Sequence, residues 1–156
     1  MNMLRRTRIR AFSLVELVIV VVIIGIIGAI AIPRLSRGSA NASENALRGD
    51  LAVLRRAIEL YAAEHDNTFP TDANIVTQLT LFSDIAGNTN AAKSSVFMFG
   101  PYIKEMPKLP VGAAKGNAGV ATTAGAGVGW IYTGGNLSAN TTALEVDGAN
   151  VKFNLY

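Results

Sequence analysis

One carboxylate in this sequence lies within a long apolar run, where a charged side chain requires an explanation. Leu14 to Ile32 contains 19 residues, and Glu16 is the only charged residue among them. A carboxylate held in a water-poor environment costs several kcal/mol unless a cation or hydrogen-bond donors compensate it, and ionisable residues in such runs are functional by default. The sequence therefore predicts a specific role for Glu16. A side chain that merely reaches the membrane boundary is the simpler alternative.

The other reactive side chains do not form the pattern of an enzyme. His65 is the single histidine and the chain has no cysteine, so no cluster has the spacing of a metal site. No serine stands in a Gly-x-Ser-x-Gly turn, and the glycine-rich stretch 112–129 lacks the Gly-Lys-Ser/Thr ending of a phosphate loop. We expect His65, near a helix end, to be a capping or surface residue. An enzyme is the least favoured class of function, and no cofactor is expected.

The apolar run around Glu16 is long enough to cross a membrane. As a helix it would span roughly 28 Å, close to a hydrocarbon core of about 30 Å. Residues 1–11 carry four arginines and no acid, which should keep them cytoplasmic and direct the rest of the chain outward. These arginines exceed the net charge of +3, so the remaining chain is slightly acidic. The basic pI therefore does not predict nucleic-acid binding.

Two ordinary interpretations of this N-terminus, a cleaved signal peptide and a plain signal anchor, compete with a specific role for Glu16. Ala29-Ile30-Ala31 has the small-x-small spacing of a signal-peptide cleavage site, although the run exceeds a usual apolar region of about 7–15 residues and Pro33 follows closely. A plain signal anchor fits the length, but it gives no reason for Glu16.

The same segment resembles the type IV pilin and pseudopilin superfamily. The matching residues are Phe12-Ser13-Leu14-Val15-Glu16-Leu17, the Val/Ile run with Gly25 and Gly28, and the ending Ala29-Ile30-Ala31-Ile32-Pro33. The resemblance implies cleavage between Ala11 and Phe12 by a prepilin peptidase, followed by N-methylation of Phe12. Ala11 departs from the family's usual glycine but is also small.

The resemblance also implies a structural role. After cleavage, Phe12 would carry a cationic amine four residues from Glu16, and in a filament the carboxylate of one subunit would pair with the amine of a neighbour. The partners implied are other copies of the chain, the prepilin peptidase and an assembly platform in the inner membrane. While the helix is in the inner membrane, the head would lie on the extracytoplasmic side. After assembly the head would lie in a cell-surface or periplasmic filament.

The sequence divides into four segments. Residues 1–11 form the leader, 12–33 the transmembrane and assembly helix, 34–65 an amphipathic helix, and 66–156 the head. Gly25, Gly28 and Pro33 weaken the helix and could let it loosen in a filament, whereas in lipid it should stay continuous. Beyond Pro33 an apolar stripe predicts a helix to about Glu64 that packs onto the chain's own head, and it comprises Leu47, Leu51, Leu54, Ile58 and Tyr61.

The head is predicted to combine a short helix with a small antiparallel sheet. The helix is expected from Asp72 to Phe82, capped by Thr71 or Asp72, and residues 112–129 are expected to be a flexible loop. Strands are predicted at 130–132 and 136–138 around Gly134-Gly135, and at 143–146 and 150–155 around Asp147-Gly148. The expected fold class is α+β, with the pilin-like arrangement of a long N-terminal helix on an antiparallel sheet.

Weaker similarities extend into the head. His65 to Pro70, Gly100 to Ile103 with Pro107, and Gly129 to Tyr132 resemble stretches of proteins related to the major pseudopilin of type II secretion. Such proteins often bind calcium through acids in a C-terminal loop, for which this chain offers Glu145 and Asp147. A solvated turn explains these two acids equally well.

Two further functions remain open. The chain could be a minor or tip pilin that binds DNA, a surface or a secreted substrate through exposed lysines, or an anchored domain that never polymerises. The candidate lysines are Lys93, Lys104, Lys108 and Lys115.

Overall fold

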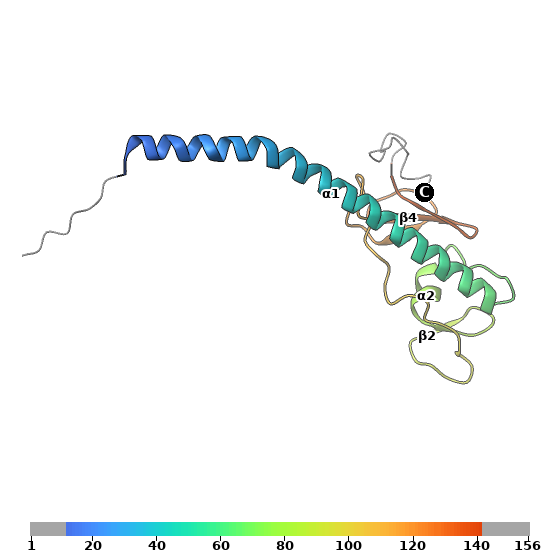
Figure 1. Cartoon of the computed structure of the whole chain (residues 1–156). Coiled ribbons are helices and arrows are strands. Elements are labelled where there is room, and N and C mark those ends of the chain that lie inside the picture. Colours follow the sequence, from blue (N-terminus) through green and yellow to red (C-terminus); the bar gives the residue numbers. More distant parts are fainter. Residues whose placement is uncertain (1–11, 142–156) are drawn as a thin grey trace, which may run out of the picture. The chain divides into compact units, whose positions relative to one another are not determined.

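Helix α1, Leu14–Glu64, is the longest element of the chain (Figure 1). The computed structural model describes residues 12–141. The chain divides into two units, Met1–Ser39 and Ala40–Tyr156, and α1 contributes residues to both. The predicted end of the helix at about Glu64 is confirmed. The helix is continuous through Gly25, Gly28 and Pro33.

The end of α1 is set by two residues with left-handed backbone conformations. Asp66 has a φ of 50° and Asn67 a φ of 59°, which Asp and Asn adopt more readily than other side chains. The backbone N–H of Asn67 donates to the carbonyl of Ala62 at 2.8 Å. This bond satisfies a carbonyl that the helix end would otherwise leave unpaired, and the chain turns away from the helix.

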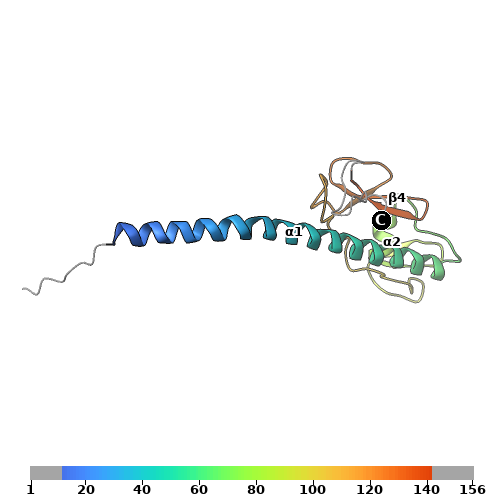
Figure 2. The same ribbon diagram turned by 45° about the horizontal axis from the view of Figure 1, so that its top comes forward.

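The second unit, from Ala40 onward, has its core along one face of α1. All five residues of the predicted stripe are at most 2 % exposed, so the predicted contact of this stripe with the head is confirmed. They form one cluster with side chains from α2, β4 and β5, among them Leu79, Trp130, Tyr132 and Leu137. Figure 2 shows β4 and the C-terminal part of α1 side by side.

The second helix is shorter than predicted. Helix α2 spans Ile75–Thr80 and follows Asn74, which makes no side-chain capping bond. The predicted caps have other partners: the backbone N–H of Thr71 donates to Gln78 Oε1 at 2.8 Å, and Asp72 Oδ1 accepts the backbone N–H of Gly134 at 3.0 Å. The Asp72 carboxylate is engaged in a tertiary contact and Thr71 is bonded to Gln78 of α2 itself, so neither residue caps the helix, and it begins later. It also ends earlier, since Phe82 belongs to a strand.

The strands form two small sheets. Strands β1 (Phe82–Ser83) and β2 (Thr89–Asn90) pair antiparallel. The second sheet has the order β3-β4-β5, with bounds Gly119–Ala121, Val128–Thr133 and Asn136–Ala139. Strand β5 pairs antiparallel with β4, as the sequence predicts, but β3 pairs parallel with β4. The layout is α+β, with antiparallel and mixed sheets.

The prediction of a flexible loop over 112–129 is wrong in part, because this stretch contains β3 and the start of β4, although 112–118 and 122–127 lie outside the strands. Its glycines permit close backbone contact. A Cβ at Gly129 would overlap the carbonyl oxygen of Asn117, and one at Gly119 would meet that of Gly127. Two of the glycines that suggest flexibility in the sequence, Gly119 and Gly129, are thus required by tight packing.

The predicted Gly134-Gly135 turn is confirmed. It joins β4 to β5 through φ values of 55° and 91°, which suit a two-residue hairpin turn. The predicted strands at 143–146 and 150–155, with Asp147-Gly148 between them, lie outside the described residues.

Candidate functional site

The first turn of α1 places Glu16 against its own backbone. Glu16 Oε2 accepts the N–H of Ser13 at 3.0 Å, and the N–H of Leu17 donates to the carbonyl of Ser13 at 3.2 Å. A serine before the helix and a glutamate three residues later is a known start signal, in which the acid satisfies an N–H that has no helical partner. Sequence reasoning could have found this role for Glu16 from the Ser13-x-x-Glu16 spacing.

The rest of this helix segment is apolar on every side. All Val, Leu, Ile and Phe side chains from Phe12 to Leu35 are 45–79 % exposed. Leu14–Ile32 has a mean hydropathy of 3.1 and is long and apolar enough to cross a membrane. A helix that is hydrophobic all round requires an apolar environment, which lipid or a bundle of similar helices provides.

The two glycines in this segment have few neighbours within the chain. A Cβ at Gly25 would meet nothing within 4 Å, and one at Gly28 would meet only Ile32 Cδ1 at 3.9 Å. Packing inside the described chain therefore gives no reason for glycine at either position. The cleavage residue Ala11 and the two acids Glu145 and Asp147 lie outside the described residues.

In the second unit, a buried polar network surrounds His65. The expectation of a surface residue is wrong, because His65 is 2 % exposed, whereas the expected capping role is confirmed by its bond to a carbonyl in the last turn of α1. Its Nδ1 lies 2.8 Å from the carbonyl oxygen of Tyr61, and its Nε2 lies 3.0 Å from Ser83 Oγ. Since the Tyr61 carbonyl can only accept, Nδ1 donates to it, and Nε2 shares a hydrogen bond with Ser83 Oγ. The imidazole also stacks on the Tyr61 ring, with centroids 3.8 Å apart.

The network continues to Tyr102, whose hydroxyl donates to Glu64 Oε2 at 2.6 Å. Burial and the neighbouring Glu64 carboxylate raise the pKa of Tyr102. Ser83 is fully buried, so its contact with His65 offers no access to a substrate. The network therefore fixes the end of α1 against β1 and the segment around Tyr102.

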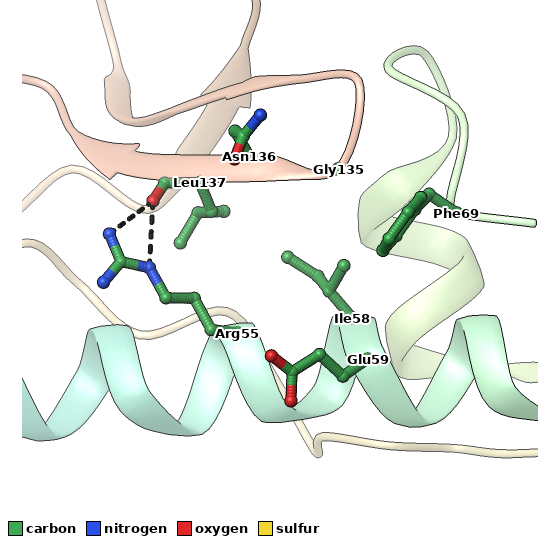
Figure 3. A pocket seen from close by; sticks show the side chains of 7 residues that line it. All are labelled: Arg55, Ile58, Glu59, Phe69, Gly135, Asn136 and Leu137. Atoms are coloured by element: carbon green, nitrogen blue, oxygen red, sulfur yellow. Dashed lines mark hydrogen bonds between the residues drawn. The ribbon is translucent and has the colours of Figure 1, made fainter. Parts of the chain in front are cut away.

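A cavity of about 310 Å³ lies in the second unit between α1 and the β4–β5 turn. Figure 3 shows Arg55, Ile58 and Glu59 on the α1 side, Leu137 and Asn136 opposite, and Phe69 at one end. Arg55 reaches across, and its Nε and Nη2 donate to the carbonyl oxygen of Leu137 at 3.3 and 3.0 Å. Among residues 12–141, no three His, Cys, Asp or Glu side chains group together as metal ligands.

Residues 6–32 match the model of the family described as the prokaryotic N-terminal methylation motif. No curated protein and no solved structure matches the chain. The motif supports a type IV pilin- or pseudopilin-like protein, and it implies processing by a prepilin peptidase and assembly with pilin subunits. Together with the apolar helix it is consistent with membrane anchoring before assembly. Pilin-like proteins with this motif are structural subunits.

Proposed function

We propose that this pilin-like protein is the structural subunit of a type IV pilus-like filament. A prepilin peptidase cleaves the chain between Ala11 and Phe12, the new Phe12 amine is methylated, and the subunits polymerise through their N-terminal helices. Before assembly the helix holds the chain in the inner membrane. After assembly the head lies in a filament at the cell surface or in the periplasm. No cofactor is needed for assembly, and calcium at Glu145 and Asp147 remains a prediction.

The observation that carries this proposal is the apolar helix surface with one acid in its first turn. The Val, Leu, Ile and Phe side chains from Phe12 to Leu35 are exposed around the helix, so they can contact lipid in the membrane and other helices in a filament. Moving from lipid to a bundle exchanges one apolar environment for another, so packing and polar pairing decide whether the helices associate.

Glu16 provides such a pairing. Within one chain its carboxylate accepts the backbone N–H of Ser13, and a carboxylate can accept several bonds. Cleavage creates a second donor, the cationic Phe12 amine, and an amine from a neighbouring subunit can approach Glu16 while Ser13 stays bound. Each new contact would neutralise two charges in a water-poor bundle and set the axial register of the subunits.

Gly25 and Gly28 fit the same arrangement. Because no contact with another described residue requires glycine at either position, their small size is available to a partner helix. Small residues let helix backbones approach closely in membranes. The loosening of the helix between Gly25 and Pro33 would belong to the assembled filament, where neighbouring subunits can satisfy the backbone.

The experiment that tests the proposal is mass spectrometry of the native protein, followed by imaging of sheared surface fractions. We expect a chain that begins at N-methylated Phe12 and that is the main component of filaments. A chain that keeps Met1 to Ala11 would refute processing and indicate a static anchor. A processed chain that is scarce in the filaments would indicate a minor or tip subunit instead.

A further inference from the structure

Positive charge follows the apolar part of α1 directly. The stretch that is long and apolar enough to cross a membrane ends at Ile32, and Arg34 comes two residues later. Between Glu16 and Glu44 the sequence contains only two charged residues, Arg34 and Arg37. The apolar stretch is therefore bounded by an acid near its start and by positive charge just beyond its end.

The continuous helix fixes the distance between these two boundaries. Helix α1 includes both Glu16 and Arg34, which are 18 positions apart. At about 1.5 Å per residue they are roughly 27 Å apart along the axis, close to a hydrocarbon core of about 30 Å. When Arg34 lies at the headgroups of one leaflet, Glu16 therefore lies at the boundary of the other.

No contact within the described chain holds the Arg34 side chain. It is exposed, and within residues 12–141 its guanidinium has no hydrogen-bond or ion-pair partner. Ile32 and Leu35, which are close to it in the helix, are 71 and 79 % exposed. A long cationic side chain at such a place keeps its stem along apolar surface and its charged end at the membrane interface.

We propose that Arg34 binds the phosphate group of anionic phospholipids in the extracytoplasmic leaflet and thereby sets the depth of α1 in the membrane. The guanidinium has five N–H donors in a planar fork, and two of them can bind one phosphate group. A surface of anionic lipid also attracts each arginine close to it. The proposal rests on the proposed function for the side of the membrane on which Arg34 lies.

The same contact would act on Glu16. Because one helix joins the two residues, binding of Arg34 to phosphate would keep Glu16 at the cytoplasmic boundary, where water and headgroups lower the cost of its charge. Without the charge of Arg34 the uncharged run would extend to Ser36, and the depth of the helix would be less sharply defined. Arg34 would thus hold the subunit in position before assembly.

The test uses the full-length chain in vesicles of phosphatidylcholine and phosphatidylglycerol, in which part of the phosphatidylglycerol carries a diazirine beside its phosphate. Illumination attaches this lipid to nearby residues, and fragmentation of the intact chain in a mass spectrometer locates the attachment. The parent is compared with Arg34→Gln and Arg56→Gln. Arg56 is an exposed arginine of α1 in the second unit, so its variant is matched in charge. Attachment to the leader, which has four arginines, is the internal standard.

We expect attachment within residues 33–38 to fall about fivefold in Arg34→Gln, because one arginine near an anionic surface contributes an attraction of this size. Arg56→Gln should stay at the parent level. Equal attachment in the parent and Arg34→Gln would overturn the proposal, and it is the result expected if a neighbouring subunit were the partner of Arg34.

A second measurement does not depend on how the variants insert. The parent is probed with phosphatidylcholine that carries the same diazirine, and we expect less attachment within residues 33–38 than with phosphatidylglycerol. Equal attachment of the two lipids would overturn the preference for anionic headgroups. None of these outcomes requires cleavage at Ala11 or filaments, so failure here is distinct from failure of the proposed function.

Discussion

Replacement of Glu16 by Gln and by Ala separates two roles that this residue has in the proposed assembly. Glu16 Oε2 lies 3.0 Å from the N–H of Ser13, and glutamine can offer an amide oxygen at the same place. Glu16→Gln should therefore keep the helix start and lose only the charge. Glu16→Ala should lose both, and loss of a capping interaction costs about 0.5–2 kcal/mol in helix stability.

The expected effect on assembly is larger. Without the carboxylate, the Phe12 amine of a neighbouring subunit would stay unpaired in the helix bundle. Removing one partner of a buried ion pair costs about 3–5 kcal/mol. At about 1.4 kcal/mol per tenfold change, each subunit contact weakens by roughly two to three and a half orders of magnitude. A polymer repeats this contact in every subunit, so filaments should be absent from both variants.

Two assays check this expectation. Filament yield is measured in sheared surface fractions and by electron microscopy, and amide exchange in micelles reports the first turn of α1. Glu16→Gln should show parent-like exchange but no filaments. Filaments from Glu16→Gln, with none from Glu16→Ala, would refute the charge pairing and leave capping as the role of Glu16. Glu105→Gln, at an exposed position in the head, serves as the control and should assemble normally.

Three other predictions concern the head. Gly129→Ala should lower the free energy of unfolding by about 1–3 kcal/mol or more, because its Cβ would overlap backbone. Gly125→Ala makes only an ordinary contact at 3.7 Å and should leave the stability nearly unchanged. Urea midpoints followed by tryptophan emission compare the two variants. Leu54→Ala should cost about 2–5 kcal/mol and Val53→Ala under about 0.5, since Leu54 is fully buried and Val53 is 58 % exposed; equal midpoints for this pair would contradict the core assignment. Burial raises the pKa of Tyr132 from 10.0 to about 12, so the folded state holds this proton more tightly than the unfolded state. The stability that this provides is complete below pH 10 and is lost as the pH rises toward about 12. Tyr132→Phe should flatten that decline when the free energy of unfolding is measured against alkaline pH.

The helix and the hairpin could be predicted because their signals are local. The stripe from Leu47 to Tyr61 repeats with the helical period, and Gly134-Gly135 between β-rich residues specifies a two-residue turn. Each signal lies within a short window of sequence, where backbone preference and hydrophobic pattern agree. Those elements appear in the structure nearly as predicted.

The errors occurred where distant residues decide the local structure. Asp72 is a good helix cap by composition, but it accepts the N–H of Gly134, 62 residues away. His65 looks like a surface residue until Tyr61 and Ser83 are known to enclose it. Gly119 and Gly129 have no periodic pattern, since their requirement comes from backbone carbonyls that approach them in space. A single sequence contains no direct signal for such contacts.

The candidate site was only partly predictable. Glu16 stands out because an acid is rare in an apolar run, and its predicted pairing with another subunit stays a prediction. Its bond to Ser13 is local, and the serine–glutamate spacing could have indicated it. Arg55 could not be singled out, because in the sequence it resembles any helical arginine with an acid four residues later. Its contact with Leu137 spans 82 positions.

The attachment of the segment after α1 to the β4–β5 turn has a consequence for the order of folding. The Tyr132 hydroxyl donates to the Pro70 carbonyl at 2.8 Å, and both this bond and the bond from Gly134 to Asp72 join residues 62 positions apart. Contacts that close long loops lose chain entropy before they gain energy, so they form late. Helix α1 depends on local bonds and can form first. We therefore expect the chain to acquire its helix early and to complete its head only after β4 and β5 have been synthesised.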